Sequence, residues 1–250
     1  LPAHLPDGTP NRYRIVRLKE KLGTRSMASG EVSLEGALAW LVGPADRGFA
    51  QMTDMINMSR LSNGMRAAGL MRRALTEALW FAHRRRAFGA PIAALPLMRR
   101  QLLKMMLPAE AARSMMLCTA QQLQAADAGD DVARRRVRLL TPLIKFRACR
   151  DARRVTGDAM EVRGGCGYIE EWSDARLVRD SHLGSIWEGT SNIVATDVLR
   201  AIRRENALDA LAGMLREITR SIGHAALRDD LDAAFGRVGT LARHAIASGA

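Results

Sequence analysis

The hydrophobic pattern divides the chain into a short strand-like part and a long helical part. Residues 13–18 and 31–36 alternate apolar and polar side chains, which is typical of half-buried strands. From about residue 51 the apolar positions recur at spacings of three, four and seven, which predicts amphipathic helices. Because two strands alone are marginal in water, we expect residues 1–50 to be the last strands of a sheet whose other strands are not in this sequence.

The helical part predicts four long segments. The first begins near residue 51 and ends at 88–91, where Gly and Pro break it. The second carries the stripe of residues 95–123 and stops at 128–131. The third extends from about 132 to 162, and Pro142 is expected to kink it or to end its first part. After a glycine turn at 163–167 the sequence is interpreted as irregular up to Gly189, and a fourth helix is predicted from Ser191 to about Arg204.

The pattern favours an up-and-down four-helix bundle, because long antiparallel helices are joined by short breaks. Two weaker helices are predicted at 207–221 and 229–248, so residues 51–204 form the expected bundle and 205–250 are additional helices. The methionine-rich stripes are interpreted as core, since an unbranched thioether side chain fills irregular gaps between helices. Their members are Leu61, Met65, Ala68, Leu75, Leu79, Ala82, Leu95, Met98, Leu102, Met105, Met116 and Leu123.

Composition agrees with a helical protein of the reducing cytosol. The chain has 250 residues, of which 48% are hydrophobic and only 4% aromatic, a balance that favours helices over a β-sandwich. The three cysteines form no CxxC pair and argue against a disulfide framework or a zinc site. No apolar stretch is long enough to span a membrane, and residues 1–4 do not resemble a signal peptide. The missing initiator Met predicts a fragment or a processed chain.

The net charge of +12 points to an anionic cofactor or a polyanionic partner without choosing between them. Residues 131–154 hold nine Arg or Lys and two acids, and residues 72–104 hold eight and one. Each basic run is either a solvated helix face or a binding surface for an anion such as nucleic acid.

The candidate chemistry lies in two short stretches. Gly164, Gly165 and Gly167 would let the backbone turn sharply and approach a ligand closely. Glu188 follows two apolar residues, and apolar surroundings raise the pKa of a carboxyl towards the value that a general base needs. Gly189 leaves room for a flat ligand, and Thr190 or Ser191 can cap a helix whose free amides would face an anion. The alternatives are a plain glycine turn, a capped helix and a surface glutamate.

These motifs together resemble the acyl-CoA dehydrogenase family. GGCGY at 164–168, RxxRD at 176–180 and IWEGTSNI at 186–193 match its C-terminal signature. RRAFG at 85–89 resembles its RxxFG element, and LKEKLG at 18–23 with GEV at 30–32 resembles the end of its middle β-domain. The match is in order over residues 13–204. Within the family, the sequence most resembles the AidB-type, adaptive-response branch. The residues that carry this resemblance are PI at 91–92, LPLM at 95–98, TP at 141–142, KF at 145–146, AMEV at 159–162 and Trp187.

The resemblance implies a mainly α fold, the C-terminal four-helix bundle preceded by the last strands of the middle β-domain. It implies α,β-desaturation of an acyl-CoA thioester, with Glu188 as the catalytic base and hydride transfer to FAD. Some members of the family carry the base on the first bundle helix, where this chain has Ser59, which cannot act as a base. Arg60 and Gly189 match positions at the acyl-CoA pocket.

The resemblance also implies the cofactor contacts. Arg85 and Phe88 match residues that reach the FAD of a neighbouring subunit, with Arg85 on the pyrophosphate. Gly164 and Gly165 match a close approach to the adenosine end. Thr190 and Asn192 match FAD contacts just after the base. The chain departs from the family pattern at Ala87, Pro96 and Glu161.

The expected partners are acyl-CoA, a second or further copies of the chain in a homodimer or homotetramer, and an electron acceptor protein. One alternative function is an AidB-type flavoprotein that binds nucleic acid and has weak or no dehydrogenase activity. Another is a helical assembly domain with a degenerate site. The isolated chain is expected to fold and self-associate in the cytoplasm while holding little FAD, because half a site loses most of its binding energy.

Overall fold

The computed structural model describes residues 1–248, which divide into two compact units, Leu1–Ile56 and a second unit that begins at Asn57. The first unit contains an antiparallel pair of strands, β1 (Tyr13–Leu18) and β2 (Gly30–Leu34), with Tyr13 opposite Leu34 and a register shift between Ile15 and Arg17. The predicted strands are therefore confirmed. Their apolar side chains stay largely exposed, since Ile15, Leu18 and Leu34 are 58–63% accessible.

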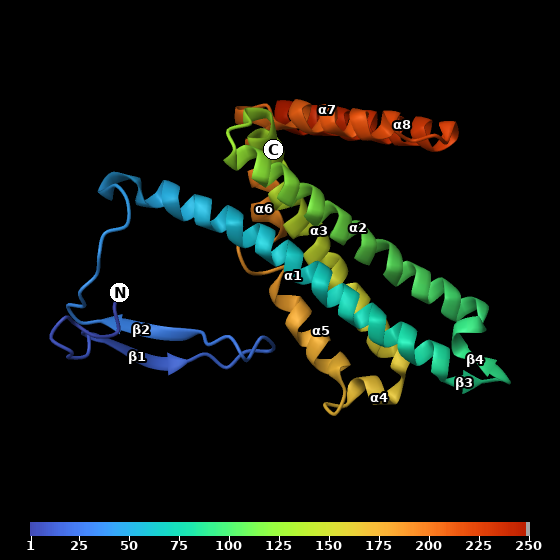
Figure 1. Ribbon diagram of the computed structural model, residues 1–250, viewed down its shortest axis with the longest axis horizontal. Coiled ribbons are helices and arrows are strands. Elements are labelled where there is room, and N and C mark those ends of the chain that lie inside the picture. The colour runs from blue at the N-terminus through green and yellow to red at the C-terminus, as the bar shows by residue number, and fades with distance from the viewer. Residues whose placement is uncertain (249–250) are drawn as a thin grey trace. The chain divides into compact units, whose positions relative to one another are not determined.

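The second unit is the predicted helical bundle, drawn as the long coiled ribbons of Figure 1. Its elements are α1 (Gly48–Arg84) from Asn57 onwards, α2 (Pro96–Asp127), α3 (Asp131–Arg163), α4 (Gly165–Tyr168), α5 (Ser173–Leu183) and α6 (Ser191–Glu205). The helix α3 is central, because it packs against α2, α5, α6 and α7 (Ala207–Arg220). Among residues 1–248, no helix is both long and apolar enough to cross a membrane.

The methionine-rich stripes form the core as predicted, with one exception. Met71 and Met105 are fully buried with leucines and alanines of α1, α2 and α3. Met65 is instead half exposed. Small side chains let α1 and α3 approach closely, since a Cβ on Gly64 would come within 3.0 Å of Ile144. The bundle is thus held by alanine-rich faces that bring the two helices near enough for their polar side chains to meet.

The structure differs from local expectations in three places. Pro142 does not end the first part of α3, which is continuous from Asp131 to Arg163, and the alternative of a kink stays a prediction. The first helix ends at Arg84, and the break after it is a small hairpin of β3 (Arg86–Ala87) and β4 (Ala90–Pro91). A short 3-10 helix at Ile92–Ala94 follows the hairpin, and another at Ala45–Arg47 precedes α1. The stretch before Gly189 contains α5, whose buried face includes Asp174 and Ser181. Because those buried residues are polar, the apolar spacing that marks the other helices is missing.

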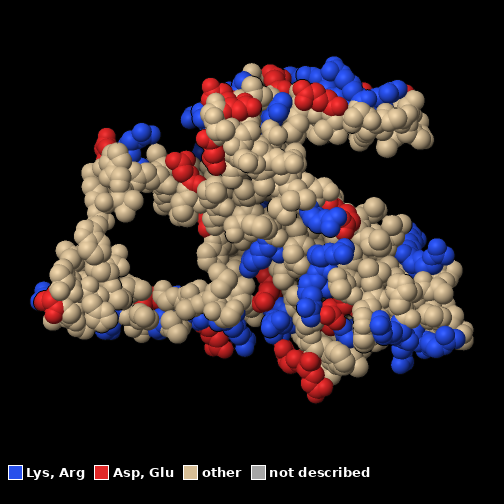
Figure 2. All heavy atoms as spheres, viewed as in Figure 1, with Lys and Arg blue, Asp and Glu red and all other residues tan. Residues whose placement is uncertain are grey.

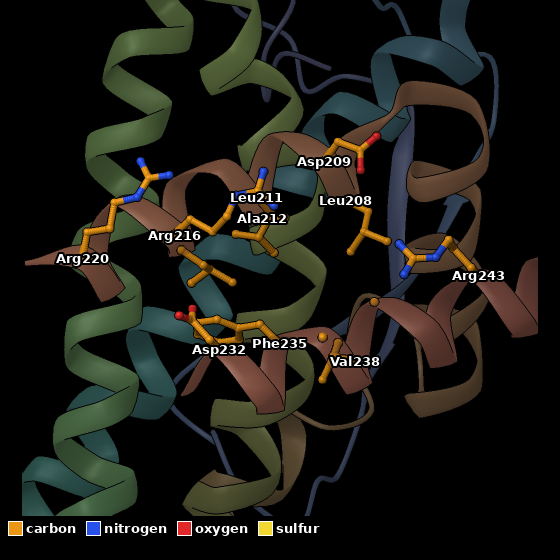
Figure 3. Close-up of a pocket in the computed structure, with 13 residues that line it drawn as sticks. Leu208, Asp209, Leu211, Ala212, Arg216, Arg220, Asp232, Phe235, Val238 and Arg243 are labelled. Atoms are coloured by element: carbon orange, nitrogen blue, oxygen red, sulfur yellow. The ribbon is translucent and has the colours of Figure 1, made fainter. Parts of the chain in front are cut away.

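The last helix packs more loosely than the other helices. A second apolar cluster joins α7 to α3 and α6 through Leu139, Ala201 and Leu211. α8 (Ala225–Ala247) has no buried residue. A groove of about 490 Å³ lies between α7 and α8. Figure 3 shows leucines of α7 and Phe235 and Val238 of α8 along it, with charged side chains of Asp209, Asp232 and three arginines around them.

The glycine turn packs against α3, the helix that precedes it, and so has a structural role. Gly164 has φ +70° and ψ −147°, a conformation that suits glycine. A Cβ on Gly167 would overlap the backbone carbonyl oxygen of Met160 on α3. A Cβ on Gly165 would meet nothing within 4 Å. Two of the three glycines are therefore required by the fold.

We expect Gly167→Ala to lower the free energy of unfolding by about 1–3 kcal/mol, because backbone atoms of α3 must move to admit the methyl group. The matched variant Gly165→Ala should stay within about 0.5 kcal/mol of the parent. Urea denaturation followed by circular dichroism measures both. Equal stability of the two variants would contradict the close approach at Gly167.

Candidate active site

Glu188 and Gly189 form a left-handed pair of residues between α5 and α6. Their φ angles are +56° and +101°. The first is unusual for a residue with a side chain and costs roughly 1–2 kcal/mol. A Cβ on Gly189 would come within 3.0 Å of Ile193. The backbone at the predicted base therefore has a conformation that its surroundings must maintain.

The carboxylate of Glu188 is bound on one oxygen only. Its Oε1 accepts hydrogen bonds from the Ser59 hydroxyl at 2.9 Å and from the Trp187 indole N–H. Its Oε2 has no hydrogen-bond partner among residues 1–248. The apolar enclosure expected from the sequence is absent in this part of the chain, because Ile186 is 63% and Trp187 38% exposed. The site therefore presents one oriented carboxylate oxygen beside two exposed apolar side chains.

Arg60 contacts the backbone of Glu188. Its Nε donates to the backbone carbonyl of Glu188 at 3.1 Å, and its guanidinium pairs with Asp197 of α6. Arg138 of α3 pairs with both oxygens of Asp197 and, at 3.1 Å, with Glu205. Arg60 is only 6% exposed. Contact between Arg60 and acyl-CoA stays a prediction, and the structure places this arginine in an ion-pair network that joins α1, α3 and α6.

Two opposing effects act on Asp197. Burial raises the pKa of its carboxyl, but hydrogen bonds from Arg138 and the charges of Arg138 and Arg60 outweigh that effect and hold the pKa below its usual value. The carboxylate is therefore ionised in the folded protein at neutral pH, as the two arginines require.

Lys145 of α3 is a second buried cation at the site. Its ammonium donates to the backbone carbonyl of Gly189, and the side chain is 1% exposed. Burial lowers its pKa. In the sequence, Lys145 is recognisable only as part of the KF pair at 145–146 that belongs to the family resemblance. A signal was present, because Lys145 falls between Thr141 and Ala148 on the buried face of α3.

The start of α6 completes this end of the site. Thr190 is the N-cap residue, as expected, but its side chain makes no capping hydrogen bond. Ser191 instead accepts a hydrogen bond from Arg150 at 2.8 Å. Thr190 and Asn192 are both exposed beside Glu188. Their polar groups are available to a ligand of the site.

The remaining predicted cofactor residues lie far from Glu188. Arg85, Phe88, Gly164 and Gly165 are exposed near the opposite end of α1, where Figure 1 shows β3 and β4. At a rise of about 1.5 Å per residue, the end of α1 is roughly 36 Å from Arg60. The structure therefore separates the predicted site residues into one group around Glu188 and another around the hairpin.

The basic run at 131–154 does not form one solvated face. Lys145 is buried, and Arg138 is paired within the bundle. Arg134 pairs with Asp131, while Arg147 and Arg154 both pair with Asp151. Figure 2 shows lysine and arginine in several separate clusters among acids on the helical unit. The nucleic-acid interpretation stays a prediction without support from a continuous basic stripe.

The helical bundle and the left-handed loop at Glu188 and Gly189 can be compared with known protein families. Residues 46–203 match the model of the acyl-CoA dehydrogenase C-terminal domain, and the chain belongs to the acyl-CoA dehydrogenase family. This confirms the family resemblance and the fold expected from it.

Particular relatives are similar over most of this chain. AidB of Escherichia coli K12 is 39% identical over 82% of this chain and 38% of its own length. Acyl-CoA dehydrogenase family member 11 of Caenorhabditis elegans is 34% identical over 84% of this chain and 35% of its own. The solved structure of ACDH-11 from that nematode, in complex with C11-CoA, matches with TM-score 0.93 at 30% identity, covering 99% of this chain and 43% of the other. The chain thus spans less than half the length of these relatives.

We expect Asp197→Asn to destabilise the protein by about 3–5 kcal/mol at pH 7, because the buried Arg60 loses its anion and the half-buried Arg138 keeps only Glu205. The folded-state pKa of Asp197 is depressed, so its contribution is present above the unfolded pKa of about 4 and is lost as the pH falls through the folded value. The difference between parent and variant should therefore shrink below pH 4.

Chemical denaturation at pH 7 and at pH 3 measures this difference. The exposed Asp229→Asn on α8 is the matched control and should leave the free energy of unfolding nearly unchanged. A destabilisation by Asp197→Asn that is the same at both pH values would be inconsistent with an ionised, paired Asp197.

Proposed function

We propose that this chain provides the helical, base-bearing part of an FAD-dependent acyl-CoA dehydrogenase. The observation that carries the proposal is the arrangement of Glu188. One carboxylate oxygen and the backbone carbonyl are held by Ser59 and Arg60, while Oε2 has no partner in the part of the chain that the structure describes. A carboxylate with one fixed and one available oxygen is suited to accept a proton from a defined direction.

The proposed chemistry assigns a role to each group of the site. Oε2 of Glu188 takes the proton from the α-carbon of the acyl thioester. Ser59 and the Trp187 indole keep Oε1 hydrogen-bonded and so orient the carboxyl group during the transfer. FAD, when bound, supplies the acceptor for the hydride that leaves the β-carbon. Gly189 carries no side chain beside the base, where a Cβ would come within 3.0 Å of Ile193. Proton and hydride together leave a double bond between the α- and β-carbons.

The residues present fit FAD in two places. Thr190 and Asn192 expose hydrogen-bonding groups next to Glu188. At the hairpin, Phe88 is 94% exposed with φ +52°, beside the exposed Arg85. A fully exposed aromatic ring in a strained backbone next to a cation suits a surface that a flat anionic ligand covers. Because Arg85 directly follows α1, roughly 36 Å from Arg60 beside Glu188, we propose that the two places serve different FAD molecules in a homodimer or homotetramer, as the family resemblance implies.

The substrate class is proposed from the same site and from the relatives. ACDH-11, which matches nearly the whole chain, was solved with C11-CoA. The apolar side chains of Ile186 and Trp187 are exposed beside the base, where an acyl chain would cover them. An acyl-CoA thioester is therefore the substrate that we assign, with an electron acceptor protein as the partner that reoxidises the flavin.

Glu188→Gln should keep FAD and lose acyl-CoA-dependent bleaching of the flavin. A positioned base contributes roughly 10²–10⁴-fold to proton transfer, and the amide cannot take the proton. Stopped-flow absorbance of the longer, FAD-loaded parent protein measures the rate, because the isolated chain is expected to hold little FAD. Glu217→Gln, on the exposed side of α7, is the matched control. Equal reduction rates in parent and Glu188→Gln would refute the assignment of the base.

Arg85→Gln should weaken FAD binding roughly 10- to 100-fold, because hydrogen bonds to charged groups contribute about 1.5–3 kcal/mol. Fluorescence titration of the apoprotein with FAD measures the dissociation constant. Arg84→Gln is the control, since the Arg84 guanidinium lies 4.4 Å from the centroid of the Trp80 ring. Equal affinities for both variants would show that the hairpin does not bind the cofactor.

A further inference from the structure

The buried ammonium of Lys145 has no role in the proton transfer described above. Its Nζ donates to the carbonyl oxygen of Gly189, which is its one hydrogen bond among the residues that the structure describes. The side chain lies on the core face of α3, beside the fully buried Ile144 and one turn from the fully buried Cys149. A buried cation is costly, and an apolar side chain of similar volume is commonly as stable or more stable at such a position. Core packing alone therefore does not explain a lysine here.

The ammonium acts on the backbone that carries the base. Arg60 from α1 holds the carbonyl of Glu188, and Lys145 from α3 holds the carbonyl of the next residue. Both of these residues have positive φ angles. Two cations from different helices thus bind two successive carbonyls of a left-handed segment.

The two contacts together fix the orientation of both carbonyl groups, which neither contact would do alone. Glycine is free to rotate about φ and ψ, so the Gly189 peptide plane would turn if its carbonyl were released. That rotation would change the path from Glu188 into α6, and the Glu188 carboxylate would move with it. The side-chain contact with Ser59 fixes Oε1 but does not determine the direction of the backbone.

We propose that Lys145 is a positioning residue that holds the Gly189 carbonyl and thereby fixes the direction in which Glu188 presents its free carboxylate oxygen. This inference rests on the proposed function of Glu188. It predicts that removal of the ammonium slows proton abstraction while substrate binding is retained, because the groups that contact acyl-CoA are not changed.

The variant is Lys145→Met, which keeps much of the length and apolar volume of the side chain but has no donor. In the longer, FAD-loaded parent protein, the rate of acyl-CoA-dependent flavin reduction should be lower by roughly 10- to 100-fold, as expected for a misplaced catalytic group. The dissociation constant for acyl-CoA and the flavin content should not change. Lys145→Gln, which restores an N–H donor without the charge, should lose less. Lys104→Met, an exposed lysine of α2, is the matched control.

A second measurement does not depend on activity. Hydrogen–deuterium exchange should become faster in Lys145→Met at the amides of residues 187–191 and stay unchanged in α1 and α2. Exchange and reduction rates equal to those of Lys104→Met would overturn the proposal. Faster exchange throughout the bundle, in Lys145→Met and Lys145→Gln alike, would also overturn it, because the lysine would then be a general stabiliser.

The two measurements separate this inference from the proposed function. If parent and Glu188→Gln reduce the flavin at the same rate, Glu188 is not the base, and the inference about Lys145 fails with it even where exchange becomes faster. If Glu188→Gln is inactive while Lys145→Met behaves as the parent in rate and exchange, the proposed function stands and the inference alone is wrong.

Discussion

Asp197 is the anion on which the geometry of the site depends. It receives Arg60 from α1 and Arg138 from α3, and it belongs to α6, the helix that begins directly after the predicted base. Charges of this kind are costly to bury unless each one is paired. Asp197 pairs with both arginines, so α1, α3 and α6 are held in one relative arrangement. Because Arg60 also donates to the Glu188 carbonyl, the same arrangement positions the backbone of the proposed base.

The central helix α3 combines packing and chemistry on neighbouring residues. Ile144 packs against Gly64 of α1, where the two helices approach closely, and Ala148 is buried in the same core cluster. Lys145 lies between those core positions and reaches Gly189. A bulkier interface would separate α1 from α3 and would move the two cations away from the carbonyls that they hold. The alanine-rich core is thus part of the reason that the base has a defined direction.

The hydrophobic pattern predicted the strands and the long helices. The motifs pointed to candidate groups of the site, but not to the hydrogen bonds and ion pairs that hold those groups. Apolar periodicity located α2, α3 and α6 closely, because their faces bury apolar side chains. It missed α5, where Asp174 and Ser181 are buried instead. The same limit applies to the site. Glu188 was found from its motif, but Asp197 and Arg138 read as ordinary charges on basic helices, since a buried ion pair between distant segments leaves no local pattern. Likewise, the motifs alone do not show how far apart Arg85 and Glu188 lie, although the family resemblance assigns Arg85 to the FAD of a neighbouring subunit.

The most direct test of this account is a crystal structure of the protein with FAD and a non-reactive acyl-CoA analogue. The account predicts that Oε2 of Glu188 faces the α-carbon of the thioester, while Oε1 keeps its hydrogen bond with Ser59 and the carbonyls of Glu188 and Gly189 stay on Arg60 and Lys145. A structure in which the Glu188 carboxylate points away from the α-carbon, or in which another carboxylate faces it, would contradict the account.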